Sequence, residues 1–215
     1  MSTLQLKYPQ LCLVTDPEKP DLIQKVEQAL AAGVTMLQLR GHTLSSAHLY
    51  TLASVLRPLC QKYQAMFIVN DRVDVGLAAG ADGFQLGAHS LPLTVARQLV
   101  GERCLLGASV HSQEEACAAV ANGADFLLVG TIFASSSHPG ESTSGPQLVR
   151  NLKRVGLTLP LLAIGGITSA NAQQVMEAGA DGIAVISAIL DVPNIEHAVR
   201  ELCTIITNEG KDRYG

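Results

Sequence analysis

The pentapeptide AGADG occupies residues 79–83 and returns at residues 178–182, and this repeat decides the fold. Shorter forms follow the same pattern, with AGV at residues 32–34 and NGAD at residues 122–125. Each copy follows a stretch with apolar residues at helical spacing and precedes a short apolar run. Glycine suits the left-handed backbone conformation that ends many helices, and small neighbours let the chain turn tightly. The repeat therefore predicts successive turns from a helix into a strand, with its aspartates as turn residues.

Outward from these turns, apolar strands alternate with amphipathic helices along the whole chain. The expected strands are residues 11–15, 36–40, 66–70, 83–86, 104–108, 126–129, 161–164 and 183–186. The expected helices are residues 22–30, 45–63, 73–79, a segment opened by Pro92, 112–122, 146–154, 171–178 and 195–207. Eight such units predict a single-domain (βα)8 TIM barrel over residues 1–215, with residues 208–215 as a flexible polar tail. A doubly wound sheet would carry a glycine fingerprint after its first strand, where residues 15–18 read TDPE.

Composition and charge restrict the class of protein. The net charge of −4 comes without a basic run, and the chain has no tryptophan, so we expect no nucleic-acid partner. No apolar run reaches membrane-spanning length and residues 1–10 lack a signal-peptide pattern, so we expect a cytoplasmic protein with no membrane partner. The five cysteines are scattered without a CxxC pair, which favours buried reduced thiols over a metal cluster. A homo-oligomer is compatible with these features.

Polar residues follow the expected strands at what would be one end of the barrel. TIM-barrel active sites are built at the carboxyl ends of the strands and in the loops that follow. The polar residues at these positions are Thr15, Asp16, Gln38, Arg40, His42, Asn70, Asp71, Gln85, His89, Ser90, Ser109, His111, Thr131, Ser135 and His138. Their convergence predicts an enzyme or a small-ligand binder rather than a structural protein.

The loop after residues 126–129 is rich in hydroxyl groups and ends at His138, between a serine and a proline. Loops on a rigid scaffold commonly carry ligand contacts. An imidazole titrates near neutral pH, which makes His138 a candidate general base. A solvated surface histidine is the alternative interpretation.

Two further loops predict a phosphate site. IGGI at residues 164–167 follows the seventh expected strand, and its bare backbone N–H groups could approach an anion. VISAI at residues 185–189 adds N–H groups and a hydroxyl after the eighth strand, where barrels often hold a phosphate. Close packing is the alternative reason for the two glycines. The residues to which we assign phosphate binding are Gly165, Gly166, Val185 and Ser187.

Six short motifs together resemble one family. They are QLR at residues 38–40, VNDR at 69–72, GADGFQLG at 80–87, GASVH at 107–111, AIGGI at 163–167 and VISAI at 185–189. In this order they resemble the thiamine-phosphate synthase and TenI superfamily over most of the chain. The resemblance implies one of two activities on a small phosphorylated thiazole. A synthase joins a pyrimidine diphosphate to a thiazole phosphate with Mg²⁺ and releases pyrophosphate, whereas a TenI tautomerase isomerises a thiazole carboxylate phosphate without metal.

The departures from the synthase pattern all fall where Mg²⁺ and pyrophosphate would bind. The resemblance would place lysines at His42 and His138 and an aspartate at Ser90, whereas the other metal carboxylate, Asp71, is kept. A single carboxylate is a poor Mg²⁺ site, because Mg²⁺ is usually held by one or two carboxylates together with substrate phosphates. The two lost lysines also remove charge that would stabilise a departing pyrophosphate. The pattern therefore favours the metal-independent tautomerase, with no cofactor expected and with Mg²⁺ at Asp71 only in a synthase.

In a tautomerase, a base would remove a proton from one ring carbon and return a proton to another. A histidine can do both, and His138 is the first candidate for this base, with His89 or His42 as its possible partner. Some TenI members carry a histidine directly after the glycine of strand six, where this chain has Thr131. Two alternatives stay open, a synthase with an altered Mg²⁺–pyrophosphate site and a non-catalytic binder or regulator that kept the barrel. The expected substrate-binding residues are Gln38, Arg40, Asn70, Ser109, Thr131 and Ser135.

Overall fold

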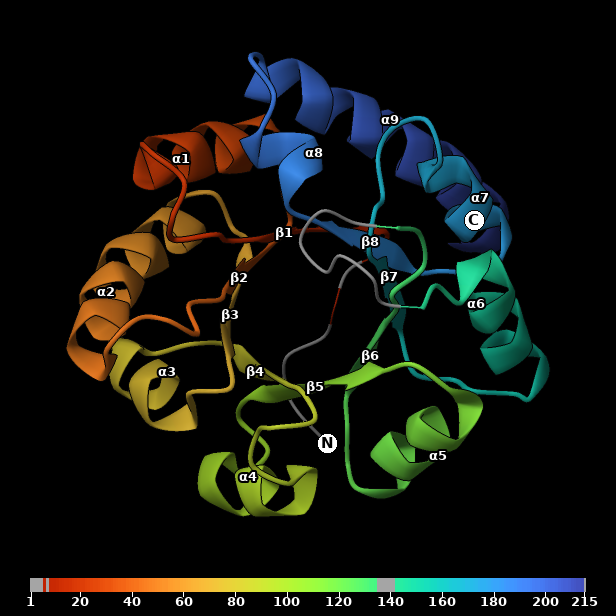
Figure 1. Cartoon of the computed structure of the whole chain (residues 1–215), viewed down its shortest axis with the longest axis horizontal. Coiled ribbons are helices and arrows are strands. Elements are labelled where there is room, and N and C mark those ends of the chain that lie inside the picture. Colours follow the sequence, from red (N-terminus) through yellow and green to blue (C-terminus); the bar gives the residue numbers. More distant parts are fainter. Residues whose placement is uncertain (1–5, 7, 135–141, 215) are drawn as a thin grey trace.

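Eight parallel strands close into a barrel in chain order, and the helices surround it (Figure 1). The computed structural model describes residue 6, residues 8–134 and residues 142–214. The strands are β1 (Gln10–Val14), β2 (Met36–Leu39), β3 (Met66–Asn70), β4 (Gly83–Leu86), β5 (Leu105–Val110), β6 (Phe126–Val129), β7 (Leu161–Ile164) and β8 (Gly182–Val185). β1 pairs with β8 in the register of Gln10 opposite Gly182, which closes the sheet. The predicted single-domain (βα)8 barrel is confirmed.

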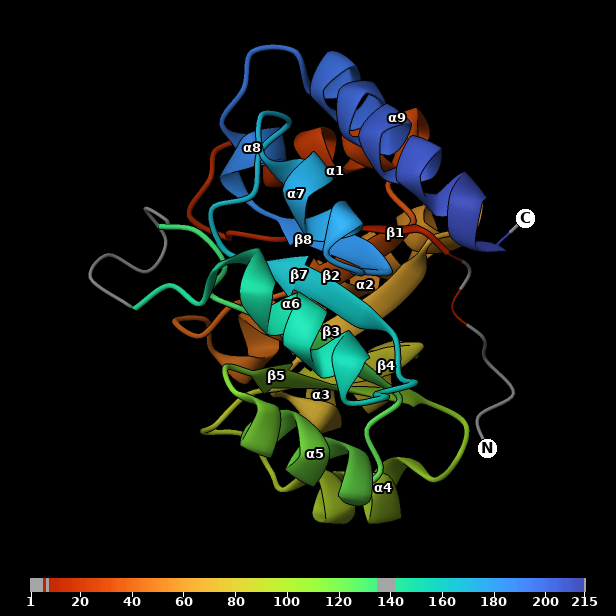
Figure 2. The same cartoon turned by 90° about the vertical axis from the view of Figure 1, so that its right-hand side faces the viewer.

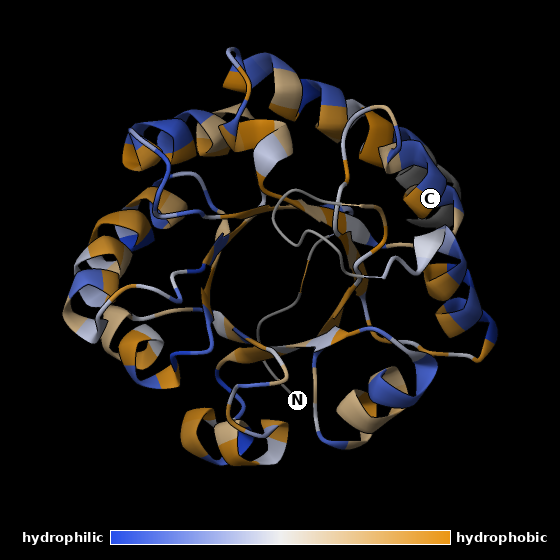
Figure 3. Cartoon of the chain, in the orientation of Figure 1, coloured by the Kyte–Doolittle hydropathy of each residue, from blue (hydrophilic) through white to orange (hydrophobic). Residues whose placement is uncertain are grey.

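In the residues that the structure describes, one helix follows each of the first seven strands and two follow β8, and apolar (orange) and polar (blue) segments alternate along the helices in Figure 3. None of them is long and apolar enough to span a membrane within the described part of the chain. Their bounds are α1 (Leu22–Ala32), α2 (Ser46–Lys62), α3 (Val73–Ala79), α4 (Leu93–Val100), α5 (Gln113–Ala121), α6 (Gly145–Arg154), α7 (Ala172–Glu177), α8 (Ser187–Leu190) and α9 (Ile195–Tyr214).

Side-chain caps mark where two helices begin. The Ser45 hydroxyl accepts a hydrogen bond from the His48 N–H at 3.3 Å, and the Ser112 hydroxyl accepts one from the Glu115 N–H at 3.1 Å. The Glu115 carboxylate accepts from the backbone N–H of His111 at 2.7 Å, which fixes the entry into α5. Such bonds satisfy N–H groups that have no partner inside the helix.

The last helix is longer than the sequence indicates. We expected a helix over residues 195–207 and a flexible tail over residues 208–215, but α9 continues to Tyr214. Its residues Val199 and Leu202 are buried where α9 packs along α1 and α7. Once this packing has formed the helix, each further residue adds a hydrogen bond at little cost, so a polar end can extend it.

The aspartates of the repeated turn connect neighbouring units. Each one accepts a hydrogen bond from the first backbone N–H groups of an adjacent strand and binds a basic side chain of a preceding helix. The pairs are Asp82 with the Phe67 N–H at 2.8 Å and Arg57 at 2.7 Å, Asp125 with the Leu106 N–H at 2.8 Å and Arg97 at 2.6 Å, and Asp181 with the Leu161 N–H at 2.8 Å and Lys153 at 2.7 Å. These aspartates therefore connect neighbouring βα units as well as forming the turns.

The interior of the barrel is packed with apolar side chains. Cys12, Met36, Ile68, Phe126 and Leu162 are buried there and form a cluster separate from the one between barrel and helices. Leu6, which precedes β1, joins this inner cluster, and Figure 2 shows the N-terminus at the end of the barrel where the strands begin. The barrel is thus filled at that end, which leaves room for a ligand at the other.

Candidate functional site

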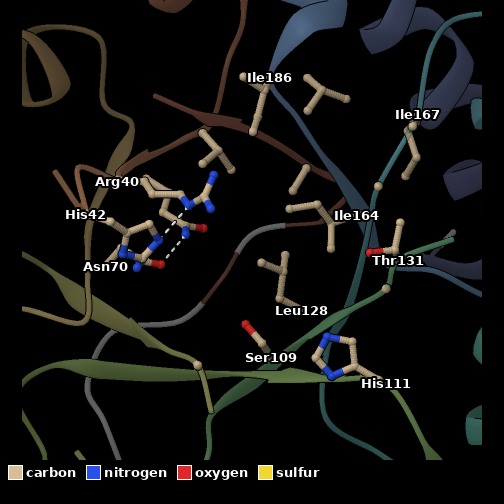
Figure 4. Close-up of a pocket in the computed structure, with 18 of the residues that line it drawn as sticks. Arg40, His42, Asn70, Ser109, His111, Leu128, Thr131, Ile164, Ile167 and Ile186 are labelled. Carbon is tan, nitrogen blue, oxygen red and sulfur yellow. Dashed lines mark hydrogen bonds between the residues drawn. The ribbon is translucent and has the colours of Figure 1, made fainter. Parts of the chain in front are cut away.

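A cavity of about 470 Å³ lies at the carboxyl ends of the strands (Figure 4). Its size is in the range of small-molecule sites. Two of the predicted site residues, Ser135 and His138, lie outside the residues that the structure describes. All the other residues to which a catalytic, substrate-binding, phosphate-binding or metal role was assigned line the cavity: Gln38, Arg40, His42, Asn70, Asp71, His89, Ser109, Thr131, Gly165, Gly166, Val185 and Ser187. Two of the polar residues expected at this end of the barrel, Thr15 and Asp16, line a smaller neighbouring pocket instead.

Asp71 is the centre of the polar wall. It follows β3 with a positive φ of 58°, a backbone conformation that is uncommon outside glycine, and it lines the cavity. Its Oδ2 accepts a hydrogen bond from the Asn70 amide at 2.6 Å, and its Oδ1 accepts one from the Ser90 hydroxyl. Gln38 in turn donates its Nε2 to Asn70 Oδ1 at 2.8 Å. A chain of amides from β2 and β3 therefore fixes the carboxylate at the cavity wall.

His42 connects Arg40 with Asp71. Its Nε2 accepts a hydrogen bond from Arg40 Nε at 2.9 Å, and its Nδ1 lies 3.3 Å from Asp71 Oδ2. An arginine has only donors, so Nε2 of the ring must be the acceptor and Nδ1 carries the proton toward the carboxylate. The imidazole holds the guanidinium at the cavity wall, on the left in Figure 4.

Two residues of the site have roles that the sequence did not predict. Ser90 is noticeable in the sequence only as a missing aspartate, yet its hydroxyl donates to Asp71 and accepts the Gly87 N–H at 2.7 Å. Gln85 is 1% exposed inside the barrel and donates its Nε2 to Ser109 Oγ at 3.0 Å. The signal for Gln85 was a glutamine between two apolar residues of a strand, because such amides are rarely buried without a reason.

The glycine loop after β7 lies on the opposite side of the cavity from Arg40. Gly165 and Gly166 have positive φ values of 101° and 60°. A Cβ at Gly165 would overlap Thr131, and a Cβ at Gly166 would overlap the carbonyl oxygen of Ala134. The loop after β6 also pairs with this strand end, as Phe133 N–H donates to Gly165 O at 3.0 Å. Close packing therefore requires these glycines, and they also line the cavity.

The fit of a metal ion depends on Asp71. Among the described residues, no group of three or more His, Cys, Asp or Glu side chains could hold a metal. Asp71 offers a carboxylate and Ser90 a hydroxyl, and a phosphorylated ligand would add further oxygens. Mg²⁺ prefers oxygen ligands and is commonly bound by one or two carboxylates together with substrate phosphates. The donor set fits Mg²⁺ that binds with such a ligand.

The fold and the site together define a class, the TIM-barrel enzymes that bind a small molecule at the carboxyl ends of their strands. The family model described as thiamine monophosphate synthase matches residues 11–189, and the chain belongs to this family. It is 45% identical to the thiamine-phosphate synthase of Chlorobium limicola, over 92% of this chain and 94% of the relative. It is 42% identical to that of Methanospirillum hungatei, over 86% of this chain and 89% of the relative. The solved thiamine phosphate pyrophosphorylase of Pyrococcus furiosus superposes with a TM-score of 0.87 at 36% identity, over 94% and 96% of the two chains.

These relatives correct the predicted activity. The expectation of a metal-independent thiazole tautomerase of the TenI branch is wrong, because the relatives at 45% and 42% identity are named synthases. The superfamily itself was predicted correctly. Counting lost lysines and one lost aspartate overlooked what their replacements contact: His42 binds Arg40 and Asp71, and Ser90 binds Asp71. Two further expectations depended on the tautomerase interpretation and lose their basis with it. They are the proton-transfer roles of His138, His89 and His42 and the absence of a cofactor.

Proposed function

We propose that this chain is a thiamine-phosphate synthase, a transferase that joins an aminopyrimidine diphosphate to a thiazole phosphate and releases pyrophosphate. The observation that carries the proposal is a single cavity with two walls suited to two anionic groups. One wall has Arg40 and Asp71, and the other has the Gly165–Gly166 loop with Ser187. The high identity to named synthases over nearly the whole chain supports this interpretation.

We assign the diphosphate to the wall formed after β2, β3 and β4. The Arg40 guanidinium would bind phosphate oxygens, and His42 holds it in place through Nε. Asp71 and Ser90 would hold Mg²⁺ against the same oxygens. When bound there, Mg²⁺ would supply positive charge to the departing pyrophosphate. The thiazole phosphate belongs at Gly165, Gly166, Val185 and Ser187.

The bond changes of this reaction explain why the site needs no general base. The bond between the pyrimidine methylene carbon and the diphosphate oxygen breaks, and its electron pair leaves with pyrophosphate. The lone pair of the thiazole nitrogen forms the new bond to that carbon, and the ring nitrogen becomes positively charged. No proton has to be removed, so catalysis consists of orienting the two substrates and stabilising the leaving group.

The apolar part of the cavity contributes by excluding water. Leu128, Ile164 and Ile186 line it between the two polar walls (Figure 4). A reactive methylene carbon would otherwise be captured by water instead of by the thiazole nitrogen. These side chains also offer a surface for the two flat rings.

The test is a coupling assay with the purified protein, the aminopyrimidine diphosphate, the thiazole phosphate and Mg²⁺. We expect thiamine phosphate and pyrophosphate in equal amounts, and loss of both products after addition of EDTA. Binding of the thiazole phosphate without coupling at any Mg²⁺ concentration would contradict the proposal and favour the non-catalytic binder. A cytoplasmic location and a homo-oligomer remain predictions from the sequence.

A further inference from the structure

Gln85 is a buried polar side chain that the proposed reaction does not use directly. It lies in β4 below the cavity and is 1% exposed. Its Nε2 donates to Ser109 Oγ at 3.0 Å, whereas its Oε1 has no hydrogen-bond partner, the only such buried side-chain atom in the described part of the chain. A buried polar atom without a partner lowers the stability of the fold. An apolar residue would avoid this cost, so the amide requires another reason.

The neighbouring strand is built to admit this amide. Gln85 pairs in register with Gly107 of β5. A Cβ at Gly107 would overlap both Gln85 Oε1 and the ring of Phe126. Ser109 stands two residues further along β5 and therefore points to the same side of the sheet. Because Gly107 has no side chain, the Gln85 amide can occupy the space beside it and donate to Ser109.

The direction of this hydrogen bond decides what Ser109 can do. A hydroxyl has one proton to donate and two lone pairs that accept. Because Ser109 Oγ accepts the amide proton of Gln85, the hydroxyl keeps its own proton for the cavity, which it lines (Figure 4). If the amide were reversed, the hydroxyl would donate to Oε1 and would offer only an acceptor to the ligand.

We propose that Gln85 is a positioning residue, which holds the Ser109 hydroxyl as a hydrogen-bond donor to a phosphate oxygen of the ligand. The assignment rests on the proposed function. β5 is next to β4, whose loop carries Ser90, so the relevant oxygens belong to the diphosphate rather than to the phosphate at β7 and β8. Gln85 does not touch the ligand and acts through Ser109.

A double-mutant cycle tests this role. Gln85→Met keeps a similar volume and removes both the donor and the unpaired oxygen, so the melting temperature should not fall. We expect kcat to fall about tenfold with KM for the thiazole phosphate unchanged, since one charge-directed hydrogen bond is lost. In the Ser109→Ala background, Gln85→Met should change kcat by less than about twofold, because coupled residues are not additive. Gln85→Leu serves as the second variant if Gln85→Met does not fold.

Gln10 provides the matched control. It is also a buried glutamine, 2% exposed, but it lies at the opposite end of the barrel, where its Oε1 accepts from the Thr35 hydroxyl at 2.7 Å. Gln10→Met should lower the melting temperature and leave kcat unchanged. An equal loss of kcat in Gln10→Met and Gln85→Met would show a general effect of barrel packing and overturn the proposal.

A binding measurement separates this proposal from the proposed function. Calorimetric titration with inorganic pyrophosphate and Mg²⁺ needs no turnover. We expect Gln85→Met and Ser109→Ala to weaken pyrophosphate binding by similar factors, and Gln10→Met to leave it unchanged. A wild-type protein that binds pyrophosphate in this manner without forming thiamine phosphate would contradict only the proposed function. Three results would overturn the role of Gln85. The first is that Gln85→Met binds pyrophosphate as tightly as the wild type, and the second is that the wild type does not bind pyrophosphate. The third is that the losses of affinity in Gln85→Met and Ser109→Ala multiply in the double variant.

Discussion

The two ends of the barrel use aspartate in opposite ways. At the end where the strands begin, Asp82, Asp125 and Asp181 are each paired with an arginine or lysine and with a backbone N–H. At the other end, Asp71 contacts a hydroxyl, an amide and an imidazole. A carboxylate already paired with an arginine or a lysine has little charge left for a ligand, whereas one held by a hydroxyl, an amide and an imidazole can attract a metal ion. The partners, and not the residue type, separate stabilising from functional aspartates.

The largest effect is expected from Asp71→Asn. The change keeps the shape of the side chain and removes the charge that would hold Mg²⁺. We expect kcat/KM to fall by about 10³, or about 4 kcal/mol, which is the scale of a lost electrostatic group in an active site. The melting temperature should stay the same or rise slightly, as charges in active sites often oppose stability. Retention of more than a tenth of the activity would mean that Asp71 does not bind the cation.

The second effect concerns Asp181, whose side chain is 10% exposed. Asp181→Asn removes the negative charge that accepts hydrogen bonds from the Lys153 ammonium and from the Leu161 N–H, so both donors lose their charged acceptor. We expect the free energy of unfolding to fall by about 3 kcal/mol, as for the breaking of other largely buried ion pairs. Chemical denaturation measures this loss, and kcat of the folded enzyme should equal that of the wild type. A fall in kcat of Asp181→Asn without a fall in stability would contradict the assignment of Asp181 to stability and of Asp71 to function.

The fold could be predicted from the sequence because its signals are local and repeated. Each turn of the AGADG type shows where a helix ends and a strand begins, and the order of eight units then leaves few arrangements. The positions that line the cavity were predictable for the same reason. The loops that follow the strands of a parallel barrel all lie at the same end, where the active site is built. The end of α9 was harder to predict, since polar residues after a packed helix can either fray or continue it.

The contacts inside the site could not be predicted. Asp71 and Ser90 are 19 residues apart in sequence, and Gln85 and Ser109 are 24 residues apart. Which side chains meet across strands depends on register and on small residues such as Gly107, and a motif does not record either. The prediction of a tautomerase was wrong because it did not take these contacts into account. It counted lost charges, whereas function depends on what the replacing groups contact.

The third effect tests the replacement at Ser90. Ser90→Ala removes the hydroxyl that contacts Asp71 and that would offer an oxygen to Mg²⁺. Groups that orient metal ligands typically change metal affinity by 10–100-fold, and we expect about a tenfold weaker apparent Mg²⁺ affinity. Electron paramagnetic resonance of Mn²⁺ with pyrophosphate measures this without turnover. The control is Ser112→Ala at the cap of α5, which should lower stability modestly and leave Mn²⁺ binding unchanged.

The smallest effect uses a cysteine between the two ends as a reporter. Burial inside the barrel raises the pKa of Cys12 to about 12, so at pH 8 about one thiol in 10⁴ is the reactive thiolate. A thiol reagent at pH 8 should therefore label the exposed Cys117 and leave Cys12 unlabelled, as read by peptide mass spectrometry. Asp181→Asn should speed the labelling of Cys12, because lower stability makes opening of the core more frequent. Asp71→Asn should not, since the charge of Asp71 does not hold the barrel together, and faster labelling in that variant would show that both ends stabilise the core.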